Sequence, residues 1–72
     1  AAMGRTAIDR TRAQTAADAA ALAAVDGGPA AASALATRHG AVVVALSVTG
    51  DVVTLTVRLG DVTATARATD AP

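Results

Sequence analysis

Two copies of the tripeptide Gly-Asp-Val, at residues 50–52 and 60–62, constrain the fold of this chain more than any other feature. They divide residues 41–69 into three runs rich in valine, leucine and threonine, in which apolar and polar side chains largely alternate. A two-residue loop between such runs is typical of a tight β-hairpin. The spacing therefore predicts an antiparallel three-stranded meander with strands at 41–49, 52–59 and 62–69.

The two loops also predict the register. If each Gly-Asp pair forms the loop, paired residue numbers add up to 101 in the first hairpin and to 121 in the second. One face of the sheet then carries three apolar cross-strand rows, whereas the other carries threonine, serine and arginine. The rows are Val44, Val57 and Ala64; Leu46, Leu55 and Ala66; and Val48, Val53 and Ala68.

The region before Gly40 has helical character. Residues 5–25 contain no glycine or proline, and nine of these 21 residues are alanine, a strong helix former. On a helical wheel one side carries a narrow stripe, which consists of Ile8, Thr11, Thr15, Leu22 and Val25. We expect this stripe to face the apolar side of the sheet.

The segment "VDGGP" predicts the end of that helix and the start of another. Gly27 or Gly28 suits a left-handed terminal position, and Pro29 suits the first turn of a second helix at 29–39. The predicted fold class is α+β, in which both helices cover one face of the meander. We expect residues 5–69 to form one domain. Residues 1–4 are predicted to be an expression remnant or disordered, and residues 70–72 a tail.

The first strand is unusual for an edge strand. Its sequence "AVVVAL" is apolar on both faces, and no charge occurs from Ala41 to Thr49. Edge strands are normally protected by lysine, proline, a bulge or a covering segment. Two interpretations follow: the second helix or a chain end covers this edge, or the edge pairs with another molecule. The residues of this possible interface are Val42, Val43, Val44, Ala45 and Leu46.

The composition excludes several classes of function. The 72 residues include no cysteine and no aromatic residue, and the formal net charge is zero. Thiol chemistry, base stacking and an electrostatic attraction to nucleic acid are therefore not expected. No run approaches the roughly 18 consecutive apolar residues of a membrane span. A small core of alanine, valine and leucine stabilises weakly, so we expect support from a partner, an oligomer or a further segment.

No catalytic, cofactor-binding or metal-ligating residues are predicted, and we expect neither an enzyme nor a small-molecule substrate. His39 is the only histidine, and the sequence offers no thiol or second imidazole to complete a dyad or a metal site. Asp18 is the notable carboxylate, because the helical wheel places it between Leu22 and Val25. It either reaches water at the rim of the stripe or lies in the interface as a polar latch to this chain or to a neighbouring subunit.

The run "RAQTAADAAALAA" at residues 12–24 resembles the stem motif of the TadE/TadG-like proteins, the pilin-like minor components of tight-adherence (Flp) pili. The distal part, "GDVVTLTVRLGDVTATARATDAP", is similar to the end of a short actinobacterial TadE-like group found beside helicase and secretion genes. The resemblance implies a truncated type IV pilin-like architecture without enzymatic activity. The matching stem positions, implied to pack in assembly, are Ala13, Gln14, Ala16, Ala17, Asp18, Ala19, Ala20, Ala21, Leu22 and Ala23.

Two functional hypotheses follow. In the first, the chain is the soluble part of a TadE-like minor pilin or pseudopilin in the cell envelope. Its partners would be other pilin-like subunits or assembly proteins, and a preceding N-terminal helix would anchor it in the membrane. In the second, it is a freestanding soluble interaction module that forms a homodimer through the first strand.

Overall fold

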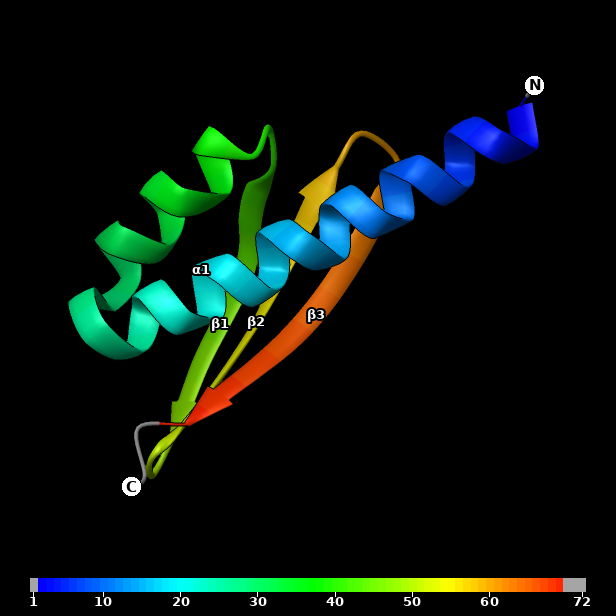
Figure 1. Ribbon diagram of the computed structural model, residues 1–72. Helices are drawn as coiled ribbons and strands as arrows, with labels where there is room; N and C mark the ends of the chain where they lie inside the picture. The colour runs from blue at the N-terminus through cyan, green and yellow to red at the C-terminus, as the bar shows by residue number, and fades with distance from the viewer. Residues whose placement is uncertain (1, 70–72) are drawn as a thin grey trace.

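The computed structural model describes residues 2–69 of the chain, and the side chains from residue 9 onward. A helix, α1 (Ala2–Arg38), precedes the strands β1 (Val42–Thr49), β2 (Val52–Leu59) and β3 (Val62–Thr69). The strands form an antiparallel sheet in the order β1-β2-β3, and α1 packs across one face of it (Figure 1). The predicted α+β layout, a helix on a three-stranded meander, is confirmed.

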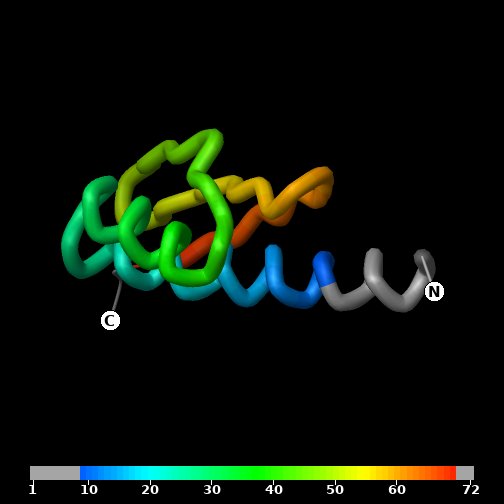
Figure 2. The backbone as a smooth tube through the Cα atoms, turned by 90° about the horizontal axis from the view of Figure 1, so that it is seen from above, coloured from blue at the N-terminus to red at the C-terminus, as the bar shows by residue number. Residues whose placement is uncertain are grey.

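The helix is broken at Gly28, where the chain turns back on itself (Figure 2). Gly28 has φ 79° and ψ −170°, a backbone conformation that is essentially restricted to glycine. We call residues 2–27 the first arm and residues 29–38 the second arm. The segment predicted as a separate helix at 29–39 is thus the second arm of α1, and α1 begins at Ala2 rather than at residue 5. The predicted tail, residues 70–72, lies outside the described residues.

The second arm ends in a Schellman motif. The N–H of Ala41 donates to the carbonyl of Ala36 at 2.8 Å, and the N–H of Gly40 donates to the carbonyl of Thr37 at 2.9 Å. Gly40 has φ 78°, the left-handed conformation that this motif requires. The motif turns the chain from the second arm directly into β1.

The second hairpin has the predicted register throughout, from Val52 opposite Thr69 to Leu59 opposite Val62. Gly60, the first residue of its loop, has φ 61°, as in a type II′ turn. The first hairpin agrees with the prediction from Thr49 back to Ala45, where the register shifts.

The predicted pairing of Val44 with Val57 is wrong, because Val43 lies opposite Val57 instead. Val44 is the extra residue of a β-bulge, which adds one residue to β1 without a partner in β2. The row predicted as Val44, Val57 and Ala64 therefore contains Val43, whereas the other two rows are as predicted.

The core lies between alanines of α1 and the inner face of β2 and β3. The largest fully buried side chains are Leu55 and Val57. The predicted stripe is wrong for Thr11, Thr15 and Leu22, which are exposed. Val25 is half-buried against the core, and the side chain of Ile8 lies outside the described residues. Alanine faces the sheet instead, because its small side chain lets the helix backbone approach closely. The buried alanines of α1 are Ala13, Ala16, Ala17, Ala20, Ala21, Ala24, Ala32 and Ala36.

Part of α1, Asp9–Arg38, is long and apolar enough to cross a membrane when judged by length and composition, with a hydropathy of 1.3. No such segment was predicted from the sequence, because no run approaches the roughly 18 consecutive apolar residues of a membrane span. The two criteria differ because a mean hydropathy credits each of the many alanines. By composition the helix is compatible with an anchor or signal sequence, and hence weakly with a cell-envelope location. In the fold, its alanine face packs on the sheet.

Candidate interaction site

The stem motif of α1 is divided between two faces of the helix. Five of its alanines face the sheet and are at most 1% exposed, namely Ala13, Ala16, Ala17, Ala20 and Ala21. Gln14, Asp18 and Leu22 are exposed, and Ala19 and Ala23 are half-buried. The alanine-rich motif therefore serves this chain's own core on one face. On the other face it leaves Leu22, which is 64% exposed, available to a partner.

Gln14 links the helix to the edge of the sheet. Its Nε2 donates to Oδ1 of Asp18 at 3.0 Å and to the backbone carbonyl of Thr65 at 3.3 Å. The amide group has two hydrogens, so both bonds can form at once. Asp18 is exposed, so the interpretation of Asp18 as a latch buried within this chain is wrong, whereas a latch to a neighbouring subunit stays a prediction. It is an exposed carboxylate that orients Gln14 along one turn of the helix.

This contact occupies one backbone carbonyl on the edge of β3. Thr65 lies opposite Thr56 in the ladder, between the pairs Leu55–Ala66 and Val57–Ala64. Its carbonyl accepts a hydrogen bond from Gln14 rather than from another strand. On the outer face the hydroxyls of Thr56 and Thr65 are 2.9 Å apart and hydrogen-bonded. The helix also packs mainly over β3 and β2. An incoming strand would have to displace Gln14 to bond to the carbonyl of Thr65.

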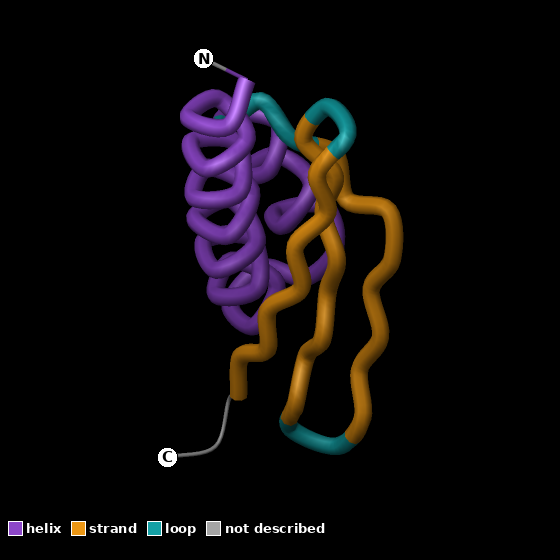
Figure 3. The backbone as a smooth tube through the Cα atoms, turned by 90° about the vertical axis from the view of Figure 1, so that its right-hand side faces the viewer, coloured by secondary structure: helices purple, strands orange, loops and turns teal. Residues whose placement is uncertain are grey.

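The edge of β1 has a different character. No strand in the described part of the chain pairs with its outer side, and α1 makes its smallest contact with this strand. Of the residues predicted for this interface, Val42, Val44 and Ala45 are exposed, and Val43 and Leu46 are half-buried. Val48, which the prediction left out, is 62% exposed although it lies on the apolar face. The β1–β2 turn extends beyond the helical layer, which explains this exposure (Figure 3).

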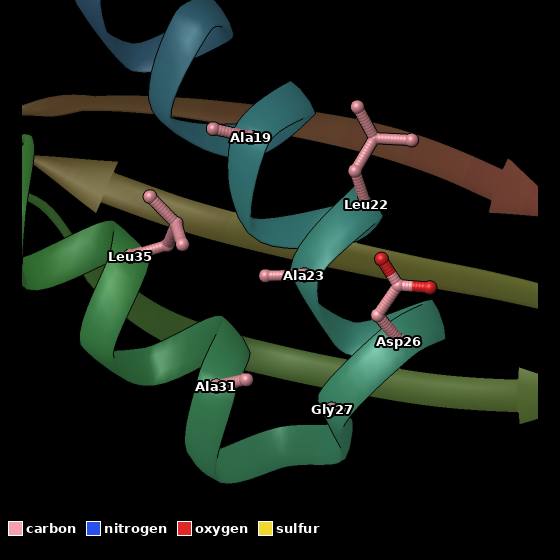
Figure 4. Close-up of a pocket in the computed structure, with 7 residues that line it drawn as sticks. All are labelled: Ala19, Leu22, Ala23, Asp26, Gly27, Ala31 and Leu35. Atoms are coloured by element: carbon pink, nitrogen blue, oxygen red, sulfur yellow. The ribbon is translucent and has the colours of Figure 1, made fainter.

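An apolar groove of about 550 Å³ lies between the two arms of α1 (Figure 4). Ala19, Ala23 and Leu35 face the space between the arms, whereas Leu22 and Asp26 stand at its rim. The arms approach closely at the elbow, where a Cβ added to Gly27 would lie 2.7 Å from the Cβ of Ala31. Sequence reasoning missed this groove, because it depends on how sharply the chain turns at Gly28.

Chemical sites are not evident among the described residues. They contain no group of three or more histidine, cysteine, aspartate or glutamate side chains that could hold a metal ion. A polar cleft between the first arm and the β2–β3 turn brings Asp9 and Arg10 near Asp61 and Thr63. His39 is exposed, and its backbone N–H continues the helix by donating to Ala36 at 3.0 Å.

Comparisons with protein-family models, with curated proteins and with solved structures found no match to this chain.

Proposed function

We propose that this chain is a non-enzymatic assembly component, the soluble part of a TadE-like minor pilin or pseudopilin of a Flp-type pilus or a related secretion system. It acts by packing its surfaces against other pilin-like subunits in the cell envelope. The observation that carries the proposal is the division of the stem motif between two faces of α1. One face packs against the sheet, whereas the opposite face presents Leu22 beside an apolar groove.

The physical basis is the small size of alanine. Leu22 stands above Ala19 and Ala23, and small side chains at this spacing let another helix approach the backbone closely. Gln14 and Asp18 are bonded to each other on the same exposed side, so they add a polar border to the apolar surface. Such a surface is suited to a neighbouring helix of a pilus-like assembly.

The experiment is site-specific photo-crosslinking in the source cell with the full-length protein. A photoreactive residue at Leu22 is expected to give crosslinks to pilin-like envelope subunits, identified by mass spectrometry. The matched control is Thr63, which is exposed on β3 away from the groove. Crosslinks from Leu22 to cytoplasmic proteins alone, or the same products from both positions, would contradict the proposal.

The open edge of β1 favours a second candidate function, a freestanding soluble module that dimerises through this strand. Cell fractionation separates the two. The pilin-like component is expected in the envelope fraction and the freestanding module in the soluble fraction. Neither candidate requires a cofactor, a nucleic acid or a small-molecule substrate.

A further inference from the structure

The outer edge of β1 has a regular stretch of five residues, 45–49, between the bulge and the turn. Thr49 lies opposite Val52 beside a two-residue loop, and such a flanking pair exchanges both hydrogen bonds. The bonding direction alternates along an antiparallel strand. By this alternation Ser47 bonds to β2, whereas the N–H and C=O groups of Leu46 and Val48 point away from the sheet.

The side chains of this stretch suit a strand of the same sequence. Leu46 and Val48 lie on the apolar face, and Ser47 between them lies on the other face. The stretch has no charge, so pairing with itself opposes no like charges. Val48 remains 62% exposed, and an apolar neighbour across a new strand pair would cover it.

We infer that β1 pairs antiparallel with β1 of a second copy of this chain, about a two-fold axis at Ser47. In this register Leu46 of each copy lies opposite Val48 of the other, and both pairs exchange their outward-facing hydrogen bonds. Ser47 lies opposite its own counterpart on the polar face. The two sheets, each of three strands, join into one continuous sheet.

A second copy fits this edge better than a strand of another kind because the pattern is symmetric about Ser47. Apolar meets apolar on one face and serine meets serine on the other. The β3 edge does not offer the same opportunity. Gln14 occupies the Thr65 carbonyl, and self-pairing centred at Arg67 would place two like charges opposite each other. The bulge at Val44 limits the pairing to the stretch that follows it.

The first test is a disulfide across the two-fold axis in the full chain, which has no cysteine of its own. Facing residues of this kind have Cα atoms about 4.5 Å apart, within the range that a disulfide spans. Ser47→Cys is expected to form a reducible dimer under mild oxidation. Thr63→Cys, at an exposed position of β3, is the matched control and is expected to remain monomeric at the same concentration.

The second test uses charge. Ser47→Lys and Ser47→Asp each place like charges opposite each other, and each is expected to weaken self-association by about fivefold. A mixture of the two variants is expected to form a heterodimer tighter than either homodimer. Circular dichroism checks that both variants keep the fold, which is expected because the Ser47 side chain is exposed.

Three results would overturn the inference: a monomeric wild-type chain at high concentration, a Ser47→Cys thiol that reacts with maleimide but forms no dimer, or a Ser47→Lys variant that associates like the wild type. The inference rests on the proposed function in that both describe an assembly module. Its failure would leave the Leu22 crosslinks intact, whereas loss of those crosslinks with a persistent Ser47 dimer would reject the pilin-like assembly alone.

Discussion

β3 and β1 are both edge strands, and both flank the same central strand β2, yet their outer sides differ. Beside β3 runs the first arm of α1, and Gln14 bonds to the carbonyl of Thr65. On the outer side of β1, away from β2, no described strand pairs with the backbone, and exposed valines remain. An exposed edge is a template for another strand. The chain thus packs its helix along one edge and leaves the outer side of the other without a partner in the described residues.

The largest effect is expected from a substitution in the core of β2, the strand that both edges flank. Leu55 is fully buried under α1 at the centre of β2, so Leu55→Ala leaves a cavity and should cost about 2–5 kcal/mol of unfolding free energy. In a domain of this size such a loss is expected to abolish the cooperative transition in urea. Leu46→Ala, on the half-buried edge strand, is the control and should unfold cooperatively. Equal stability of the two variants would contradict the assigned core.

A second change separates the helix from β3 while the sheet stays intact. Ala20 is fully buried, so Ala20→Leu overpacks the helix–sheet interface and should destabilise the fold by about 1–3 kcal/mol. It should also uncover the β3 edge and increase aggregation, which light scattering would detect. Ala34→Leu, at an exposed position of the second arm, is the control and should change stability little. A stable and monodisperse Ala20→Leu variant would show that α1 does not need alanine to cover the sheet.

The hydrogen bond between Gln14 and the carbonyl of Thr65 can be removed by a single substitution. Gln14→Ala deletes the donor to Thr65 and should lower the unfolding free energy by about 0.5–1 kcal/mol, because the bond is exposed. Thermal unfolding beside the control Thr15→Ala, an exposed neighbour on the same helix, measures this difference. If the two variants melt together, Gln14 does not hold the helix to the edge.

The smallest effect concerns the orientation of Gln14. The Gln14–Asp18 pair should contribute about 0.2–0.5 kcal/mol, the range of a side-chain pair four residues apart on a helix, and Asp18→Ala removes this pair. A double-mutant cycle with Gln14→Ala is expected to show coupling between the two positions. Strict additivity would mean that Asp18 does not position the amide group for Thr65.

The sheet was largely predictable because two-residue loops fix the register of everything next to them. The bulge was not, since residues 42–44 are all valine and a shift by one residue leaves the same residue type opposite Val57. The closest signal was the run of apolar residues on both faces of this strand. Alternation cannot specify a register where side chains on the two faces are alike.

The helix was predictable in its extent more than in its orientation. The break at Gly28 was expected from the Gly-Gly-Pro sequence. The helical wheel predicted that a stripe with Leu22 faces the sheet, whereas the buried face of the helix consists of alanines. The sheet presents alanine at Ala66, so a closely approaching alanine face fits better than leucine. The contact of Gln14 with Thr65 joins residues far apart in sequence, and no local pattern predicts it.

Hydrogen exchange measured by NMR as a function of protein concentration tests the difference between the two edges most directly. The outward-facing amides of Leu46 and Val48 are predicted to become protected as concentration rises, whereas the amides of Thr63 and Thr65 on β3 keep the same rates. Rates at Leu46 and Val48 that do not change with concentration, or protection that develops at β3 instead, would contradict the account.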